Sequence, residues 1–210
     1  MSLDSRAANM LRTMAELQDA HNRHVHPDWR SQGYDYYRAI WVECAELLDH
    51  FGWKWWKQQH PDLDQVKLEI VDIWHFALSE LLRTDALTDD LAALLVFEPE
   101  SEVPDPTAFR AAVEQLALVT LAERTFVMEP FVALMRALPM GFQELFRMYV
   151  GKNVLNNFRQ DHGYRTGEYH KLWAGREDNE HLVEVLESLS CDPDDVPGTL
   201  YAELKARYPD

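Results

Sequence analysis

Four carboxylates lie as two pairs within apolar stretches of the sequence. Glu43 and Glu46 are three residues apart in one stretch, and Glu69 and Asp72 are three residues apart in the next. On an α-helix this spacing places both side chains on one face, about one turn apart. Each of two helices would therefore present a clamp of two carboxylates.

The neighbours of these acids favour a metal site. Apolar residues around the pairs leave few directions for a solvated face: Trp41, Val42, Leu47, Ile70 and Ile73. Like charges among apolar residues are strongly unfavourable unless a counter-charge or a metal ion balances them. Oxygen ligands without a matching set of His or Cys select Mg²⁺ or Mn²⁺ over zinc. We expect Mg²⁺, with Mn²⁺ as a substitute; solvent-facing acids paired with Lys and Arg are the alternative.

A di-iron centre is a second alternative for these acids. Asp72 and His75 have the spacing of the Glu-x-x-His element of di-iron bundles, which take one such histidine from each of two helices. Three residues after Glu46, however, the chain has Asp49. The sequence therefore disfavours di-iron, and we expect His75 to be a hydrogen-bonded interior residue.

Cations and an amide recur at helical spacing in a later segment: Lys152, Asn156 and Arg159. Lys171 and Arg176 follow shortly after. An ammonium and a guanidinium beside Mg²⁺ are typical groups for holding a polyphosphate and for neutralising charge during phosphoryl transfer. The alternative is a solvated basic face paired with three nearby acids: Glu177, Asp178 and Glu180.

Two further features could recognise a base. Gln18 and Asn22 place two amides on one helix face, and an amide offers both a donor and an acceptor, as the edge of a uracil requires. The segment 53–57, WKWWK, offers flat apolar surfaces for stacking, including Trp56. Packing in the core or at an interface is the alternative for each of these tryptophans.

Apolar residues at helical spacing in nearly every segment predict an all-α fold. The expected helices are listed by residue number: 4–24, 35–50, 63–83, 91–97, 106–123, 129–138, 139–158, 179–189 and 196–208. The short connection after residue 50 predicts that the second and third helices pack antiparallel, which would bring the four acids together. Residues 163–175 are expected to form a loop. A length of 210 residues fits one domain, 1–210, with an acidic loop at about 85–105.

Composition disfavours several classes of partner. The chain has 20 Lys and Arg against 36 Asp and Glu, a net charge of −16, which disfavours nucleic acid and anionic membranes as partners. The N-terminus has no signal-like apolar core, and residues 91–97 are too short to span a bilayer. We expect a cytoplasmic protein. Cys44 and Cys191 lack finger spacing and are expected to be buried thiols, and no glycine-rich nucleotide motif is present.

Longer motifs add a resemblance to a known family. Residues 40–57, IWVECAELLDHFGWKWWK, and 69–76, EIVDIWHF, resemble the metal-binding core of the all-α dimeric dUTPases, which are related to the MazG-type nucleoside triphosphate pyrophosphohydrolases. Further segments resemble the C-terminal motifs of that family: 151–156, 158–160, 163–164 and 175–179. The resemblance extends from about residue 17 to about residue 182.

The resemblance implies a helical bundle of the all-α NTP pyrophosphohydrolase type that hydrolyses dUTP, and also dUDP, to dUMP. This activity would limit uracil in DNA and supply dUMP for dTTP synthesis. Glu43, Glu46, Glu69 and Asp72 would hold Mg²⁺, and Glu46 would also activate the attacking water. The residues implied around uracil and deoxyribose are Gln18, Asn22, Trp56 and Asn156. Those implied at the polyphosphate are Lys152, Arg159, Tyr164, Lys171 and Arg176. A homodimer with a site shared across subunits is implied as well.

The segment after Asn22 departs from the family pattern. The family usually has Thr-Asn-Gly there, whereas this chain has residues 23–27, RHVHP, so the loop near the base is expected to differ. Two alternatives remain open from the sequence. One is a housecleaning hydrolase of dCTP or of a modified nucleotide, and the other is a non-enzymatic helical interaction protein.

Overall fold

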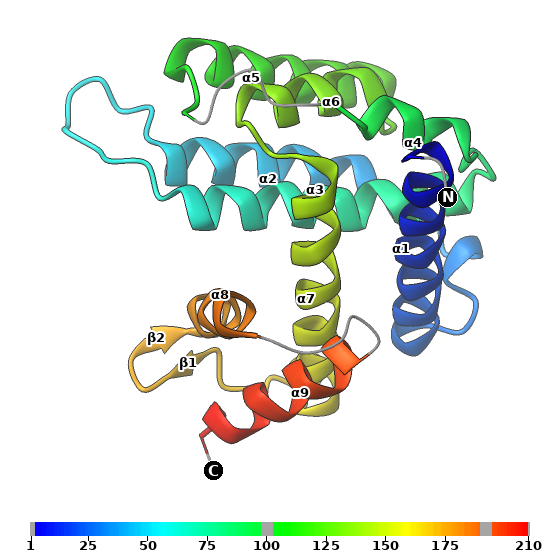
Figure 1. The fold of residues 1–210 in the computed structure, drawn as a ribbon, viewed down its shortest axis with the longest axis vertical. Helices are drawn as coiled ribbons and strands as arrows, with labels where there is room; N and C mark the ends of the chain where they lie inside the picture. The colour runs from blue at the N-terminus through cyan, green and yellow to red at the C-terminus, as the bar shows by residue number, and fades with distance from the viewer. Residues whose placement is uncertain (1–2, 98–102, 190–194, 210) are drawn as a thin grey trace. The chain divides into compact units, whose positions relative to one another are not determined.

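The computed structural model describes residues 3–97, 103–189 and 195–209, and it is helical as predicted (Figure 1). By internal contacts the chain divides into two compact units, Met1–Phe146 and Arg147–Asp210. The expectation of one domain over 1–210 stays a prediction. No described helix is long and apolar enough to cross a membrane.

The first unit holds the helices that carry the four acids. Its elements are α1 (Leu3–Val25), the 3-10 helix η1 (Trp29–Ser31), α2 (Tyr36–Phe51), α3 (Leu63–Arg83), α4 (Asp90–Leu95), α5 (Pro106–Glu123), α6 (Met128–Ala137) and the first turn of α7 (Phe142–Asp161). The expected helices 63–83 and 106–123 match α3 and α5, whereas α7 begins and ends three residues later than expected. The short helix expected within the acidic stretch 85–105 is α4, and residues 98–102 of that stretch lie outside the described residues.

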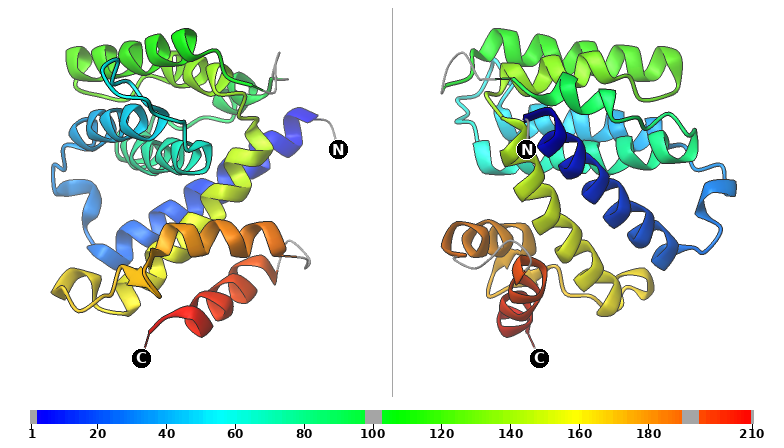
Figure 2. Two further views of the ribbon diagram at one scale, coloured as in Figure 1. Left: turned by 90° about the vertical axis from the view of Figure 1, so that its left-hand side faces the viewer. Right: turned by 45° about the vertical axis from the view of Figure 1, so that its right-hand side comes forward.

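Local sequence signals explain the clearest boundaries. The Asp62 carboxylate accepts a hydrogen bond from the Gln65 amide and caps α3, and Asp105 caps α5 ahead of Pro106. Helix α2 ends at Gly52, which has a φ of 91°, a left-handed value that glycine adopts without steric cost. Antiparallel packing of α2 and α3 follows from the short connection between them, as predicted (Figures 1 and 2).

Helix α3 lies at the centre of the first unit. It packs against α2 and α1, while α5 covers α2 and α6 packs on α5 (Figures 1 and 2). Trp74 of α3 stacks on Phe131 of α6 with ring centroids 5.1 Å apart. Because α3 is buried along most of its length, several of its polar side chains are buried too: Glu69, His75, Ser79 and Glu80.

The second unit contains the rest of α7, the 3-10 helix η2 (Tyr164–Thr166), β1 (Leu172–Trp173), β2 (Arg176–Glu177), α8 (Asp178–Ser188) and α9 (Val196–Arg207). The two strands pair antiparallel within the expected loop 163–175 and just beyond it. Positive φ angles at Ala174 and Gly175 make the tight turn. Two-residue strands are too short to show an alternating pattern, so the sequence did not predict them.

Candidate functional site

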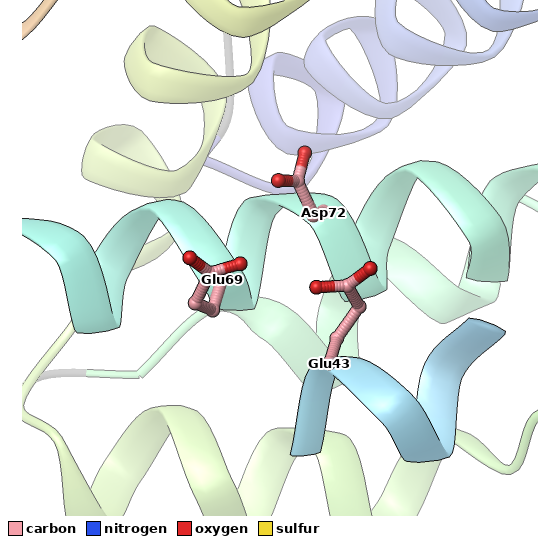
Figure 3. Close-up of side chains that lie close together, drawn as sticks. All are labelled: Glu43, Glu69 and Asp72. Atoms are coloured by element: carbon pink, nitrogen blue, oxygen red, sulfur yellow. The ribbon is translucent and has the colours of Figure 1, made fainter. Parts of the chain in front are cut away.

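Three of the four predicted carboxylates meet between α2 and α3. Oxygen atoms of Glu43, Glu69 and Asp72 all lie within 4.8 Å of one another. Figure 3 shows that Glu43 comes from α2 and that Glu69 and Asp72 come from the adjacent α3. Glu69 is buried, and the other two are half-buried. We call Glu43, Glu69 and Asp72 the carboxylate cluster.

The carboxylate cluster is electrostatically unfavourable without a counter-charge. Burial first, and then the negative charges of Asp72 and Glu69, raise the pKa of Glu43 to about 9. At neutral pH Glu43 therefore holds a proton when no cation is present. The oxygen donors suit a hard divalent cation, which would replace that proton. The His50 ring nitrogen Nε2 lies 3.4 Å from Glu69 Oε1 at the edge of the cluster.

Glu46 lies outside the carboxylate cluster. It is one turn beyond Glu43 on α2 and is exposed, although its charge contributes to the raised pKa of Glu43. The structure therefore gathers three of the four predicted metal ligands. The roles of Glu46 as a ligand and as the group that activates water stay predictions.

A polar network joins α1 to α3. The Gln18 amide nitrogen donates to Ser79 Oγ and to Asn22 Oδ1, both at 3.0 Å, and the Asn22 amide nitrogen donates to Ser79 Oγ at 2.9 Å. Gln18 Oε1 lies 2.7 Å from His75 Nδ1. The expectation that His75 is a hydrogen-bonded interior residue is confirmed. Gln18 and Asn22 were predicted from their helical spacing, but Ser79 was not.

Tyr36 also reaches this network. Its hydroxyl hydrogen-bonds with Ser79, and burial raises its pKa to about 12, so the phenol stays protonated. The only sequence signal for Ser79 is its position one turn after His75 on the buried face of α3. A lone serine in an apolar helix gives no indication of its partners.

The connection between α2 and α3 carries an exposed aromatic surface. The fractional exposures of Trp53, Trp55 and Trp56 are 45%, 89% and 57%, so none of the three packs in the core. Packing at an interface stays an alternative for these rings. Trp56 packs edge-to-face against both of the other rings. A cavity of about 370 Å³ is lined by Trp53, Trp55, Lys54, Lys57 and Arg110, among others.

In the second unit the predicted cations of α7 are held by α8. Lys152 is 1% exposed, and its ammonium donates to Asn179 Oδ1 at 3.0 Å. The Arg159 guanidinium makes two hydrogen bonds to buried Asp178, at 2.8 and 2.9 Å, and one to Asn156 Oδ1 at 3.1 Å. Burial opposes ionisation of Asp178, but the hydrogen bonds and charge of Arg159 outweigh it and lower the pKa of Asp178.

The remaining predicted cations are exposed or half-buried in the same unit. Lys171 pairs with Glu177 at 3.1 Å, and Arg176 pairs with Glu184. Exposed Tyr164 lies beneath the Arg159 guanidinium at 5.9 Å. The sequence offered, as an alternative to polyphosphate binding, that these cations pair with Glu177, Asp178 and Glu180. Two of those three acids, Asp178 and Glu177, do pair with them. Glu180 instead caps α8 with Glu177.

Cys44 belongs to none of the groups described above. Cys44 is buried as expected, and burial raises the pKa of its thiol to about 12, which keeps it unreactive. Cys191 lies outside the described residues.

Comparison with protein families gives one match that spans most of the chain. A family model described as dUTPase matches residues 10–164, a range that contains the carboxylate cluster and the α1 amides. No curated protein matches the chain. The match confirms the resemblance to dUTPases over residues 10–164 and makes the alternative of a non-enzymatic interaction protein wrong. The resemblance of residues 175–179 to a C-terminal motif of the family lies outside the matched range and stays a prediction.

Proposed function

Because the chain belongs to the all-α dUTPase family and is thus a dUTP-hydrolysing enzyme, we propose that it is a Mg²⁺-dependent dUTP diphosphatase. The products would be dUMP and pyrophosphate, and dUDP would be a second substrate. The observation that supports metal dependence is the carboxylate cluster, in which burial and the nearby charges of Asp72 and Glu69 raise the pKa of Glu43 so far that it keeps a proton at neutral pH. Mn²⁺ should substitute, because its ligand preferences are similar.

Glu43, Glu69 and Asp72 would hold the divalent cation, which supplies Lewis-acid stabilisation of phosphate charge when it is bound. The cluster fits this role because its donors are carboxylate oxygens on two packed helices. Glu46 would accept the proton of the attacking water. Its exposed position one turn from Glu43 leaves its carboxylate accessible to water and substrate.

Gln18 and Asn22 would recognise the uracil edge. Their amides are held by Ser79 and His75, so they are ordered before substrate binds. Trp56 would stack on the base, which its exposed ring permits. A site built from hydrogen bonds rejects a base with the wrong donor pattern more strongly than an apolar pocket rejects a methyl group.

Six residues of the second unit would contact the nucleotide: Lys152, Asn156, Arg159, Tyr164, Lys171 and Arg176. Asp178 and Asn179 hold Lys152 and Arg159 in one hydrogen-bonded group, which supports a common role for these two cations. We further propose a homodimer in which residues of both subunits complete each site, as the sequence resemblance implies.

The test is product analysis with a panel of dUTP, dUDP, dCTP, dTTP and UTP, each with Mg²⁺ and with EDTA. Release of pyrophosphate from dUTP and of phosphate from dUDP, in Mg²⁺ alone, supports the proposal. Turnover of dUTP that survives EDTA would contradict the metal dependence. Equal turnover of dCTP would favour the housecleaning alternative.

A further inference from the structure

Ser79 is the shared partner of the two amides that the proposed function assigns to the base. It lies on α3 and is 1% exposed. Its hydroxyl oxygen is 3.0 Å from Gln18 Nε2 and 2.9 Å from Asn22 Nδ2. The two amides come from successive turns of α1, and a single oxygen atom on the neighbouring helix binds both of them.

The only proton of the Ser79 hydroxyl is not directed at the amides. Ser79 Oγ donates to the His75 backbone carbonyl at 2.9 Å, and its other neighbour is the Tyr36 hydroxyl. A serine hydroxyl has one proton and two lone pairs. Whether the proton goes to His75 O or to Tyr36, the side of Ser79 that faces Gln18 and Asn22 can only accept hydrogen bonds.

This acceptor fixes which way each amide faces. If the Gln18 amide rotated by 180°, its carbonyl oxygen would face the lone pairs of Ser79 Oγ, and two acceptors would meet. Its nitrogen would then face His75 Nδ1 in place of the carbonyl oxygen that accepts there now. The same rotation of Asn22 would place its oxygen against Ser79 and its nitrogen against Gln18 Nε2. With the amides in their observed orientation, His75 Nδ1 donates to Gln18 Oε1 and Gln18 Nε2 donates to Ser79 Oγ, so the hydrogen bonds are donated from His75 through Gln18 to Ser79.

We propose that Ser79 is a positioning residue that determines the preference for uracil over cytosine. Its hydroxyl would do so by fixing the donor and acceptor ends of the Gln18 and Asn22 amides. This inference rests on the proposed function, in which those amides recognise the base.

The chemistry of the two bases gives the amide orientation its importance. Uracil presents an acceptor at O4 and a donor at N3, whereas cytosine presents a donor at N4 and an acceptor at N3. The two patterns are opposite at both positions. An amide that rotates by 180° exchanges its donor and its acceptor, so a site with freely rotating amides can satisfy either base. Ser79 removes that freedom without contacting the substrate.

The experiment compares Ser79→Ala with the wild-type enzyme, with kcat/KM for dUTP and for dCTP as the readout. Alanine removes the acceptor that holds both amides and leaves the helix intact. We expect the ratio of the two kcat/KM values, dUTP over dCTP, to fall by roughly 10- to 100-fold, the range expected when one or two hydrogen bonds no longer discriminate. A purely structural role would lower both kcat/KM values equally, and an unchanged ratio would overturn the inference.

A matched control removes a buried hydroxyl elsewhere. Thr120 of α5 is fully buried, and its Oγ1 has no hydrogen-bond partner among the described residues. Thr120→Val should leave the dUTP to dCTP ratio unchanged. A ratio that falls equally in Thr120→Val would mean that loss of any buried hydroxyl relaxes the site, and would also overturn the inference.

Failure of the inference and failure of the proposed function can be told apart. If the wild-type enzyme shows no preference for dUTP over dCTP, the proposed function fails, and Ser79 has no preference to determine. If the wild-type enzyme is selective and Ser79→Ala is equally selective, only the inference fails. If Ser79→Ala has too little activity, the Kd values of dUMP and dCMP replace kinetics. If the preference for dUMP over dCMP, measured as the ratio of their Kd values, is smaller in Ser79→Ala than in the wild-type enzyme, the role is supported. An unchanged ratio overturns it.

Discussion

Replacing Glu43 with glutamine should stabilise the metal-free protein and abolish its stabilisation by Mg²⁺. The oxygen atoms of the carboxylate cluster lie within 4.8 Å of one another. Two full charges at 4.8 Å repel by about 3.5 kcal/mol at an effective dielectric constant near 20. Glu43 is half-buried and loses its proton only as the pH approaches 9, so we expect about 1–3 kcal/mol of relief in the variant near that pH. For a chain of this size, 2 kcal/mol raises Tm by roughly 4–8 °C.

The stability that Glu43→Gln gains over the wild-type protein should increase with pH. The pKa of Glu43 is raised from 4.5 to about 9, so the folded wild-type protein binds a proton that the unfolded chain releases. The resulting stability is present below pH 4.5 and is lost as the pH rises toward 9. Glutamine does not titrate. The Tm difference between Glu43→Gln and the wild-type protein should therefore be small at pH 5 and largest at pH 9.

In Mg²⁺ the wild-type protein should become more stable than Glu43→Gln. A ligand at one hundred times its Kd stabilises a folded protein by about 2.7 kcal/mol, and this gain needs an intact site. Thermal unfolding followed by circular dichroism at pH 5, 7 and 9, with EDTA or Mg²⁺, measures both effects. Glu46→Gln is the matched control, since Glu46 is exposed on the same helix; it should unfold at nearly the wild-type temperature in EDTA. A lower Tm of Glu43→Gln at pH 9 in EDTA would refute the reasoning, as would an Mg²⁺ shift equal to the wild-type shift.

Three further predictions follow from the described contacts. Asp178→Ala should destabilise the protein by about 3 kcal/mol in urea unfolding, because the Arg159 side chain, which is only 12% exposed, loses its buried carboxylate partner; a loss below 1 kcal/mol would contradict this. The lowered pKa of Asp178 means that its contribution is present above pH 3.8 and is lost as the pH falls further. Thr120→Val should raise the free energy of unfolding by about 1 kcal/mol, because it removes a buried hydroxyl that has no hydrogen-bond partner among the described residues. A lower free energy of unfolding would contradict the view that this hydroxyl is buried at a cost. Calorimetric titration should give a lower Kd for Mg²⁺ at pH 8 than at pH 6, because the proton of Glu43 must leave; a pH-independent Kd would argue against the shared site.

Local signals made much of the first unit predictable. The caps at Asp62 and Asp105 are read from a few neighbouring residues, so α3 and α5 begin where the sequence indicated. The spacing of three residues between Glu69 and Asp72 sets their common helix face, which the structure confirms. The short α2–α3 connection then brought Glu43 into the same cluster.

Features that depend on long-range packing could not be predicted. Spacing alone did not show that Glu46 lies outside the cluster, because that depends on how α2 is rotated against α3. Ser79 meets Gln18 across 61 residues of sequence, and Arg159 meets Asp178 across 19. The sequence showed Lys152 as one of three residues on a helix face, but not its burial against Asn179. Each of these pairings is set by tertiary contacts, which leave no periodic pattern.

The most direct test of the central claim is the Mg²⁺ dependence of dUTP hydrolysis in the wild-type enzyme and in Asp72→Asn. Asparagine keeps the size of the side chain and removes one charge from the carboxylate cluster. We expect Asp72→Asn to fold and to lose activity by roughly 10²- to 10³-fold, the cost typical of losing one group that supports charge stabilisation in a transition state. The wild-type enzyme should be inactive in EDTA. Full activity of Asp72→Asn, or wild-type hydrolysis that persists in EDTA, would contradict the assignment of catalysis to a cation held by Glu43, Glu69 and Asp72.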